Sequence, residues 1–314
     1  MNYEGINLDI LANTMVEPGL SGGNRIFIEL AKCWAESGAK INIWTSDQGK
    51  DICLENNLIK ASYHIWNIPK RFNPKKLSRP DVFSLYVYGL FKGTSQYWAP
   101  SENPSGMNTK VVYSSSDYWP DFVPGLLAKL FGKKVYWISS LFLFAANPFY
   151  GFKEKGKLTR PSLKHLVFYL TQLPVFYLTA KLADLIFVTS SPDKERFIKY
   201  GVTSHRVVVI KGGVNIAEAT KYINNGPTLA KEYDACFMGR FHEQKGVLEL
   251  IDIWHEVCKK RPESKLAMIG GGELLDSVSN KIKDLGLEKN IELFGFLGDG
   301  EEKFNIFKKS KIVV

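Results

Sequence analysis

Ten short apolar runs constrain the fold of this chain more than any other feature of its sequence. Runs of this length suit strands that are buried on both faces, as in a parallel sheet. Stretches of helical periodicity separate most of the runs, so strands and helices are expected to alternate. This alternation predicts α/β architecture with parallel sheets. The runs cover residues 6–12, 40–45, 110–114, 134–138, 185–190, 206–210, 233–238, 265–269, 290–294 and 311–314.

Two of the intervening stretches carry clear helix signals. The stretch from Asn24 to Ser37 places its apolar residues on one side, and Gly38 is suited to end the helix. The stretch from Val247 to Arg261 repeats that pattern and stops at Pro262. Both are therefore predicted to be amphipathic helices.

Clusters of turn residues divide the chain. Gly212-Gly213-Val214-Asn215 leaves one predicted strand, and Asn224-Asn225-Gly226-Pro227 precedes the next. We therefore expect two doubly wound domains, residues 1–215 and 230–314, with a linker at 216–229 and a cleft between the domains. In such sheets ligands bind at the carboxyl ends of the strands.

Composition narrows the function classes. The 314 residues are 45% hydrophobic and 23% charged, as in globular proteins, with a formal net charge of +9. This surplus is compatible with nucleic acid, anionic lipid or phosphorylated small molecules, or with a lysine-rich surface of no special role. Nucleic acid is disfavoured because no zinc-finger spacing, ribonucleoprotein motif or basic repeat occurs. The four cysteines are far apart, which disfavours a structural zinc, and no secretory leader precedes residue 6, so a cytoplasmic location is expected.

The segment from Gly239 to Gly246 joins a predicted strand to a predicted helix and carries two cations. Glycine at both ends permits close approach of a ligand to the backbone, and the helix start carries partial positive charge. Arg240 and Lys245 can each hold a phosphate group. The segment therefore predicts an anion site.

Two further glycine-rich turns follow predicted strands. Pro18–Gly23 precedes a helix, so Gly22 and Gly23 are candidates for phosphate contact, or the turn is a flexible loop with a glycine cap. Gly270-Gly271-Gly272-Glu273 also ends a strand, without the complete glycine pattern of dinucleotide-binding folds. Glu273 is either a nucleotide-binding residue or an acid in the first turn of a helix.

Taken in order, these motifs resemble glycosyltransferase family 4, the retaining nucleotide-sugar enzymes with the GT-B fold of two Rossmann-like domains. The resemblance runs over most of the chain and is most specific in the second domain, which is incomplete by comparison. The matching segments are Gly22-Gly23, Val207–Asn215, Gly239-Arg240, Lys245-Gly246, Ile269–Gly272 and Phe294–Leu297.

The resemblance implies roles for individual residues. Arg240 and Lys245 match the pair that binds the donor diphosphate, where fixed cations stabilise the leaving nucleotide; the alternative is a surface pair with Glu243 as ion-pair partner. Gly22-Gly23 match a loop that approaches the same phosphates from the other domain. A nucleoside-diphosphate sugar is the expected donor and a saccharide or lipid-linked saccharide the expected acceptor, with no metal and no cofactor. The nucleotide is expected to lie against Gly239, Gly270, Gly271, Gly272, Glu273, Gly295, Phe296 and Leu297.

The sequence departs from the family pattern in two places. The family carries two glutamates, eight positions apart, beyond the strand that Lys311–Val314 matches, and this sequence ends there, so we expect a fragment of a longer gene. Many relatives place a histidine after the strand at 134–138, where this chain has Ser139-Ser140. Asp117 is the remaining catalytic candidate, to orient an acceptor hydroxyl; the alternative is a helix N-cap or Asx-turn.

A basic and aromatic segment, residues 142–160, predicts contact with an anionic membrane surface, so a peripheral membrane location is also considered. The alternative is a solvated turn. The apolar stretch Leu163–Ala183 is too short for a transmembrane span and contains Pro174. It is expected as a core helix, or else as a helix that lies on lipid.

Three other functions are open alternatives. A GT-B sugar-nucleotide epimerase needs carboxylate and histidine groups as acid and base, and the five histidines form no convincing pair in the sequence. A non-catalytic nucleotide-sugar-binding module fits a chain without the acidic motif. A nicotinamide dehydrogenase is disfavoured because the loop after the first strand lacks Gly-x-Gly-x-x-Gly. The preferred prediction is a glycosyltransferase of hexosyltransferase type that acts with retention.

Overall fold

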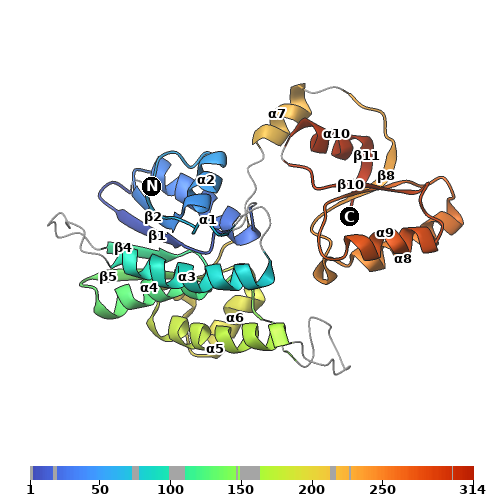
Figure 1. The fold of residues 1–314 in the computed structure, drawn as a ribbon. Helices are drawn as coiled ribbons and strands as arrows, with labels where there is room; N and C mark the ends of the chain where they lie inside the picture. Colours follow the sequence, from blue (N-terminus) through green and yellow to red (C-terminus); the bar gives the residue numbers. More distant parts are fainter. Residues whose placement is uncertain are drawn as a thin grey trace. The chain divides into compact units, whose positions relative to one another are not determined.

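The computed structural model divides the chain into two compact units, Met1–Val214 and Asn215–Val314 (Figure 1). It describes residues 3–16, 20–72, 78–98, 110–145, 148, 163–212, 217–225, 228–298 and 300–314. Both units alternate strands with helices, and every described strand pair is parallel. The predicted parallel α/β architecture is therefore confirmed.

The first unit contains a seven-stranded sheet of order β3-β2-β1-β4-β5-β6-β7. The order reverses between β1 and β4, and ligands of doubly wound sheets bind at such a reversal. The strands are β1 Asn7–Ala12, β2 Lys40–Ser46, β3 Ser62–Trp66, β4 Lys110–Ser114, β5 Val135–Ser140, β6 Leu185–Val188 and β7 Val207–Val209.

The apolar runs predict every strand of this sheet except β3. That strand lies at the sheet edge, pairs only with β2, and leaves most of its residues partly or fully exposed. A half-exposed edge strand needs no continuous apolar run, so the run pattern does not mark it.

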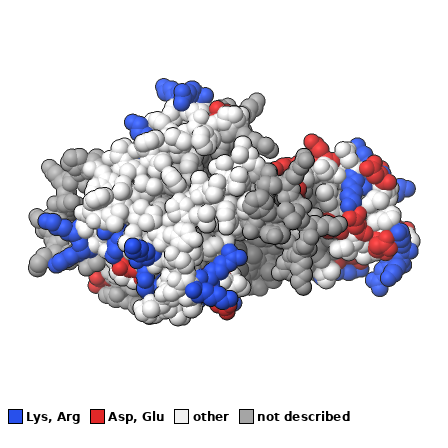
Figure 2. All heavy atoms as spheres, turned by 90° about the horizontal axis from the view of Figure 1, so that it is seen from below, with Lys and Arg blue, Asp and Glu red and all other residues white. Residues whose placement is uncertain are grey.

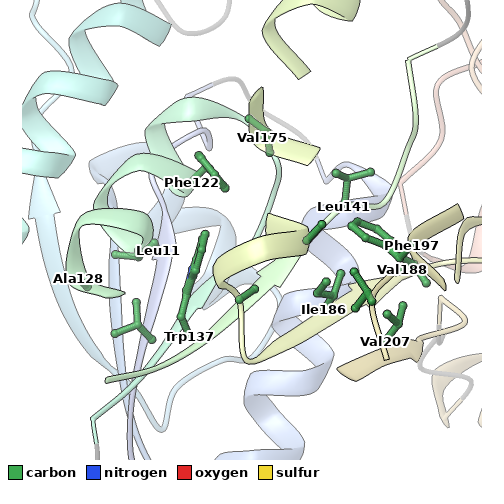
Figure 3. Packing of buried hydrophobic residues seen from close by; sticks show 14 of the residues in the cluster. Leu11, Phe122, Ala128, Trp137, Leu141, Val175, Ile186, Val188, Phe197 and Val207 are labelled. Carbon is green, nitrogen blue, oxygen red and sulfur yellow. The ribbon is translucent and has the colours of Figure 1, made fainter. Parts of the chain in front are cut away.

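Helices cover both faces of the first sheet. Ile52 of α2 packs with Phe27 of α1 on one face, and on the other Phe122 of α4 packs with Val175 of α5. Figure 3 shows this second cluster, in which Phe122 lies 5.4 Å from Trp137 of β5 between ring centroids. The helices are α1 Gly22–Glu36, α2 Asp47–Glu55, α3 Arg79–Tyr97, α4 Trp119–Phe131, α5 Leu163–Leu182 and α6 Ser191–Lys199, with a short 3₁₀ turn at Ser204–Arg206.

Both ends of α1 follow from local chemistry. Ser21 is its N-cap, and the Ser21 hydroxyl accepts a hydrogen bond from the Asn24 N–H at 3.1 Å. Gly38 adopts a positive φ of 96° just beyond the helix, as predicted for a residue that ends it. The helix begins two residues earlier than expected, so Gly22 and Gly23 belong to its first turn and not to the preceding loop.

The second unit contains a four-stranded sheet of order β10-β9-β8-β11, and the apolar runs predict each of its strands but not their order. Ile251 of α8 and Val278 of α9 cover one face, and Ile306 of α10 covers the other. The strands are β8 Tyr233–Met238, β9 Leu266–Ile269, β10 Ile291–Gly295 and β11 Ser310–Val313. The helices are α7 Ala217–Asn225, α8 Val247–Lys260, α9 Leu275–Asp284 and α10 Glu301–Lys309, with a 3₁₀ turn at Glu243–Lys245.

Helix α7 lies inside the segment 216–229 that the turn residues mark as a linker. It packs on the second unit, because Tyr222 stacks on Phe304 of α10 with ring centroids 5.4 Å apart. The Tyr222 hydroxyl also bonds to Asn305. The turn cluster at Asn224–Pro227 therefore marks the end of a short helix.

Candidate functional site

Three loops of the second unit leave the carboxyl ends of β8, β9 and β10, and backbone hydrogen bonds join them. All the predicted nucleotide and phosphate residues of this unit lie on these loops, so they share one edge of the sheet. The N–H groups of Gly239, Phe241 and Gly270 donate to the carbonyls of Ile269, Gly271 and Gly295, at 3.0, 2.9 and 2.7 Å.

Two glycines of the loop after β9 are required by the approach of the neighbouring loop. A Cβ on Gly270 would lie 1.9 Å from the Gly239 carbonyl oxygen, and one on Gly272 would lie 2.7 Å from that of Phe241. Both residues also have positive φ, 139° and 151°. Gly271 has no neighbour within 4 Å of its Cβ position. The geometry therefore supports a role in loop packing for Gly270 and Gly272. Gly271 takes no part in this packing, and the space beside it is accessible to a ligand.

Lys245 lies at the point where the loop after β8 becomes α8. Gly246 is the N-cap of α8 in the left-handed conformation, with φ of 60°, and supplies no side-chain cap. The first backbone N–H groups of α8 therefore lack a side-chain acceptor at the cap. The Lys245 side chain is exposed, and its amine bonds to no residue among those the structure describes. The positive charge of Lys245 therefore lies next to the uncapped backbone N–H donors at the start of α8.

Arg240 forms an ion pair with Glu273, at 3.3 Å between guanidinium and carboxylate. His242 faces the same carboxylate, with its Nε2 3.6 Å from Glu273 Oε1 and its Nδ1 accepting the Gln244 N–H. Glu243 is not the ion-pair partner of Arg240, because the turn at Gly272 brings Glu273 back over the loop after β8.

Glu273 is not a helix acid either. Helix α9 begins at Leu275, two residues later, and Asp276 is the acid of its first turn. Sequence separation hides the Arg240–Glu273 pair, since 33 positions lie between the two residues. The pair of His242 with Glu273 is hidden in the same way.

The loop after β10 presents one exposed aromatic ring. Gly295 has a positive φ of 68°, and the Phe296 side chain that follows is 84% exposed. Leu297 instead packs against the buried cluster that contains Cys236 and Ile306. Of the two predicted side chains, Phe296 is therefore the one that solvent or a ligand can reach.

Gly22 and Gly23 of the first unit both have room for a Cβ. A Cβ on Gly22 would have no neighbour within 4 Å, and one on Gly23 would touch the Phe142 ring at 3.4 Å, an ordinary contact. Packing within the unit therefore does not demand glycine at these positions. Their contact with donor phosphates stays a prediction.

A buried carboxylate that the sequence does not single out lies at the reversal between β1 and β4. Asp121 is fully buried in the first turn of α4 and accepts the backbone N–H groups of Asn13 and Thr14, at 2.5 and 3.2 Å. The hydroxyls of Thr14, Ser115 and Ser116 also donate to it. Burial raises the pKa of Asp121 to about 6. In the sequence it is indistinguishable from an ordinary first-turn acid.

Asp117 also follows β4 and lies against α5. Its carboxylate accepts the Gln172 amide at 2.6 Å, and burial raises its pKa to about 6. The Gln172 amide is itself fixed by the Leu143 carbonyl and the Ala145 N–H. The helix N-cap alternative for Asp117 is wrong, because the N-cap of α4 is Tyr118.

Neither a membrane-spanning helix nor a metal cluster occurs among the described residues. No described helix is long and apolar enough to cross a membrane. No group of three or more His, Cys, Asp or Glu side chains within that part of the chain is placed to hold a metal ion. The basic residues of the predicted membrane segment lie at 153–160, outside the described residues.

Comparison with known proteins follows the same division of the chain. Residues 219–314 match the model of the family described as glycosyl transferases group 1. This match lies entirely within the second unit. An uncharacterized glycosyltransferase of Methanocaldococcus jannaschii is 30% identical over 142 residues, which cover 43% of this chain. The match spans only about a third of that relative, 34% of its length.

Solved structures extend the likeness to both units. HepE of Anabaena, in complex with UDP and glucose, has a TM-score of 0.59 at 16% identity and covers 98% of this chain and 73% of its own. A UDP-GlcNAc 2-epimerase of Neisseria meningitidis, bound to UDP-GlcNAc, has a TM-score of 0.53 at 15% identity and covers 98% and 76%. The fold is therefore the GT-B fold of these glycosyltransferases, and the likeness to the epimerase shows that the fold alone does not separate the two activities.

Proposed function

We propose that this chain transfers a sugar from a nucleoside-diphosphate sugar to an acceptor hydroxyl, with retention at the anomeric carbon. The observation that carries the proposal is the exposed Lys245 amine at the uncapped start of α8, on the same loop as Arg240. The family match of residues 219–314 supports it. HepE, whose structure holds UDP and glucose, supports the choice of donor class.

The chemistry of the reaction explains the residue types. Cleavage of the anomeric C–O bond leaves negative charge on the nucleoside diphosphate, and fixed positive groups at that position lower the barrier. In the proposal Lys245 and the first N–H groups of α8 bind one phosphate. The other phosphate replaces Glu273 as the partner of Arg240, a small cost because exposed ion pairs contribute at most about 1 kcal/mol.

The nucleotide would lie along the same edge of the sheet. Gly271 leaves room for backbone contact, and Phe296 offers an exposed ring face to a base. In the first unit, Gly22 and Gly23 are proposed to face the phosphates, and Asp117 to orient the acceptor hydroxyl. A saccharide or lipid-linked saccharide is the proposed acceptor, with no metal or cofactor in the reaction.

Calorimetric titration of the full chain with UDP tests the proposal. Lys245→Ala is expected to weaken UDP binding by about 10-fold to 100-fold, the value of one charge-assisted phosphate contact. Lys259→Ala is the matched control, because Lys259 is an exposed lysine in the last turn of the same helix. Equal affinities for Lys245→Ala and wild type would remove the phosphate assignment.

The alternative functions separate in an activity assay. Incubation with labelled UDP-sugars yields transfer only when an acceptor is supplied, whereas an epimerase changes the sugar without one. If the chain were an epimerase, His242 and Glu273 would be its candidate acid and base, because the two side chains face each other beside the proposed phosphate site. Binding without either reaction would identify a nucleotide-sugar-binding module.

A further inference from the structure

The outward side of α5 is an apolar stripe. One side of the helix is buried, with Gln172, Val175 and Thr179 against the sheet. On the opposite side, the apolar residues recur at helical spacing, and the large ones are 47% to 76% exposed. We call this set the α5 stripe: Leu163, Val167, Leu170, Pro174, Tyr177 and, at its end, Lys181.

Of the two predictions for Leu163–Ala183, a core helix or a helix that lies on lipid, neither describes the whole of α5. The buried side of α5 behaves as expected, but the helix lies on the surface of the unit, and its exposed side has no charged residue before Lys181 among the side chains described. A solvated helix normally places charged residues on that side. An apolar surface of this kind on a folded unit indicates an interaction.

Neighbouring residues widen the stripe at its C-terminal end. Tyr200, directly after α6, is exposed and lies 5.2 Å from Tyr177 between ring centroids. The two tyrosines and Lys181 line an open hollow of about 310 Å³. Tyrosine rings and lysine amines on apolar stems are the side chains that place themselves between hydrocarbon and water.

The first unit carries a net positive charge, which favours contact with an anionic surface. Met1–Val214 holds 26 of the 41 Lys and Arg but only 16 of the 32 Asp and Glu, a net charge of +10. Asn215–Val314 carries −1. Figure 2 views the molecule from the side on which α5 and α6 lie in Figure 1, and shows a broad uncharged surface on the first unit with Lys and Arg around it.

We propose that the α5 stripe docks the first unit on an anionic lipid bilayer. The helix lies flat, with Val167 and Leu170 in the acyl boundary, Tyr177 and Tyr200 at the headgroups, and Lys181 extended toward lipid phosphate. This surface is distinct from the 142–160 segment that composition marks for lipid contact. It does not depend on the proposed sugar transfer.

Vesicle flotation of the full chain tests this docking. Wild type is expected to float with vesicles of phosphatidylglycerol and phosphatidylcholine, and to lose binding as salt rises. Val167→Glu/Leu170→Glu is expected to weaken binding about tenfold or more, since it puts two anions on the docking surface. Ile59→Glu is the matched control, because Ile59 is 71% exposed and follows α2, which covers the opposite face of the sheet.

A second variant tests whether the loss of binding in the double variant reflects misfolding of α5. Tyr200→Ser leaves α5 unchanged and is expected to weaken flotation by a smaller factor, while circular dichroism reports the fold of each variant. Wild-type protein that stays with the unbound fraction overturns the proposal, as does a double variant that floats like wild type. A dimer in size-exclusion chromatography that the double variant abolishes, without flotation of wild type, would assign the stripe to a second copy of the chain.

Discussion

The carboxyl edges of the two sheets use polar groups in opposite ways. In the first unit, the carboxylates Asp117 and Asp121 are held by hydrogen bonds inside the protein. In the second unit, Arg240 and Lys245 are exposed, and backbone hydrogen bonds together with the Arg240–Glu273 ion pair join the loops. The Asp121 carboxylate, which is fully buried, organises its own surroundings, whereas the exposed cations are available to a ligand.

The net charges of the two units are opposite to what the exposed cations suggest. The unit that carries the candidate phosphate-binding cations has a net charge of −1, and the unit with +10 carries the apolar stripe. A phosphate responds to the few charges and N–H groups within hydrogen-bond reach, while a membrane surface responds to the summed field of a domain. The composition of the whole chain therefore mixes two separate signals.

The largest expected effect is a loss of stability when the hydrogen-bond network at the carboxyl edge of the first sheet is removed. Asp121→Ala should destabilise the first unit by about 3 to 5 kcal/mol, because several buried donors lose their acceptor. Urea unfolding followed by tryptophan fluorescence measures this, since six of the seven tryptophans lie in that unit. Glu29→Ala, which removes a partly exposed, ion-paired carboxylate on α1 of the same unit, should change stability by less than about 1 kcal/mol. Similar midpoints for the two variants would refute a structural role for the Asp121 network.

A somewhat smaller effect is expected when the backbone junction of the second edge is disturbed. Gly270→Ala should destabilise the second unit by about 2 to 3 kcal/mol and weaken UDP binding, because the new Cβ meets the Gly239 carbonyl. Gly271→Ala is the matched control with open space at its Cβ position. Thermal unfolding without nucleotide compares the stability of the two variants, and UDP titration is applied to Gly270→Ala alone because Gly271 is itself a proposed nucleotide contact. A Gly271→Ala loss as large as that of Gly270→Ala would contradict the packing role.

The smallest expected effect is a difference in pH dependence. Burial raises the pKa of Asp117 to about 6, so this carboxyl binds a proton in the native state at pH values where the unfolded chain has lost it. Its contribution to stability is full below the unfolded pKa of about 4 and is lost as pH rises through about 6. In the second unit the Lys311 amine lowers the pKa of Asp234, so that contribution is lost as pH falls.

Asp117→Asn isolates this difference. The variant keeps an acceptor for Gln172 and removes the titration, so the fall in Tm between about pH 4 and 6 should shrink by about 2 to 4 °C. Differential scanning calorimetry measures the change. An unaltered slope would mean that Asp117 does not titrate differently in the two states.

Much of the fold was predictable because it depends on local sequence. Strands buried on both faces must be apolar throughout, so the runs locate ten of the eleven strands. Helix ends carry their own signals, as Gly38 and Pro262 show. The edge strand β3 is not located by the runs, because it is partly exposed to solvent and its residues need not all be apolar.

The candidate site divides in the same way. Arg240, Lys245 and their flanking glycines are recognisable because one short segment holds them all. Glu273 as the partner of Arg240, and Asp121 as the acceptor for Asn13 and Thr14, join positions 33 and more than 100 apart. Neither pair leaves a mark in the sequence, because each depends on which loops the sheet order brings together.

The sequence by itself determined the parallel α/β architecture, the strands of both sheets apart from β3, and the chemical character of the loop after β8. Tertiary structure decided that Gly270 and Gly272 serve loop packing, that Glu273 pairs with Arg240, and that α5 keeps one apolar side in solvent. The physical reason is range: hydrophobic periodicity and capping act over a few residues, whereas burial and charge pairing depend on neighbours that only the folded chain supplies.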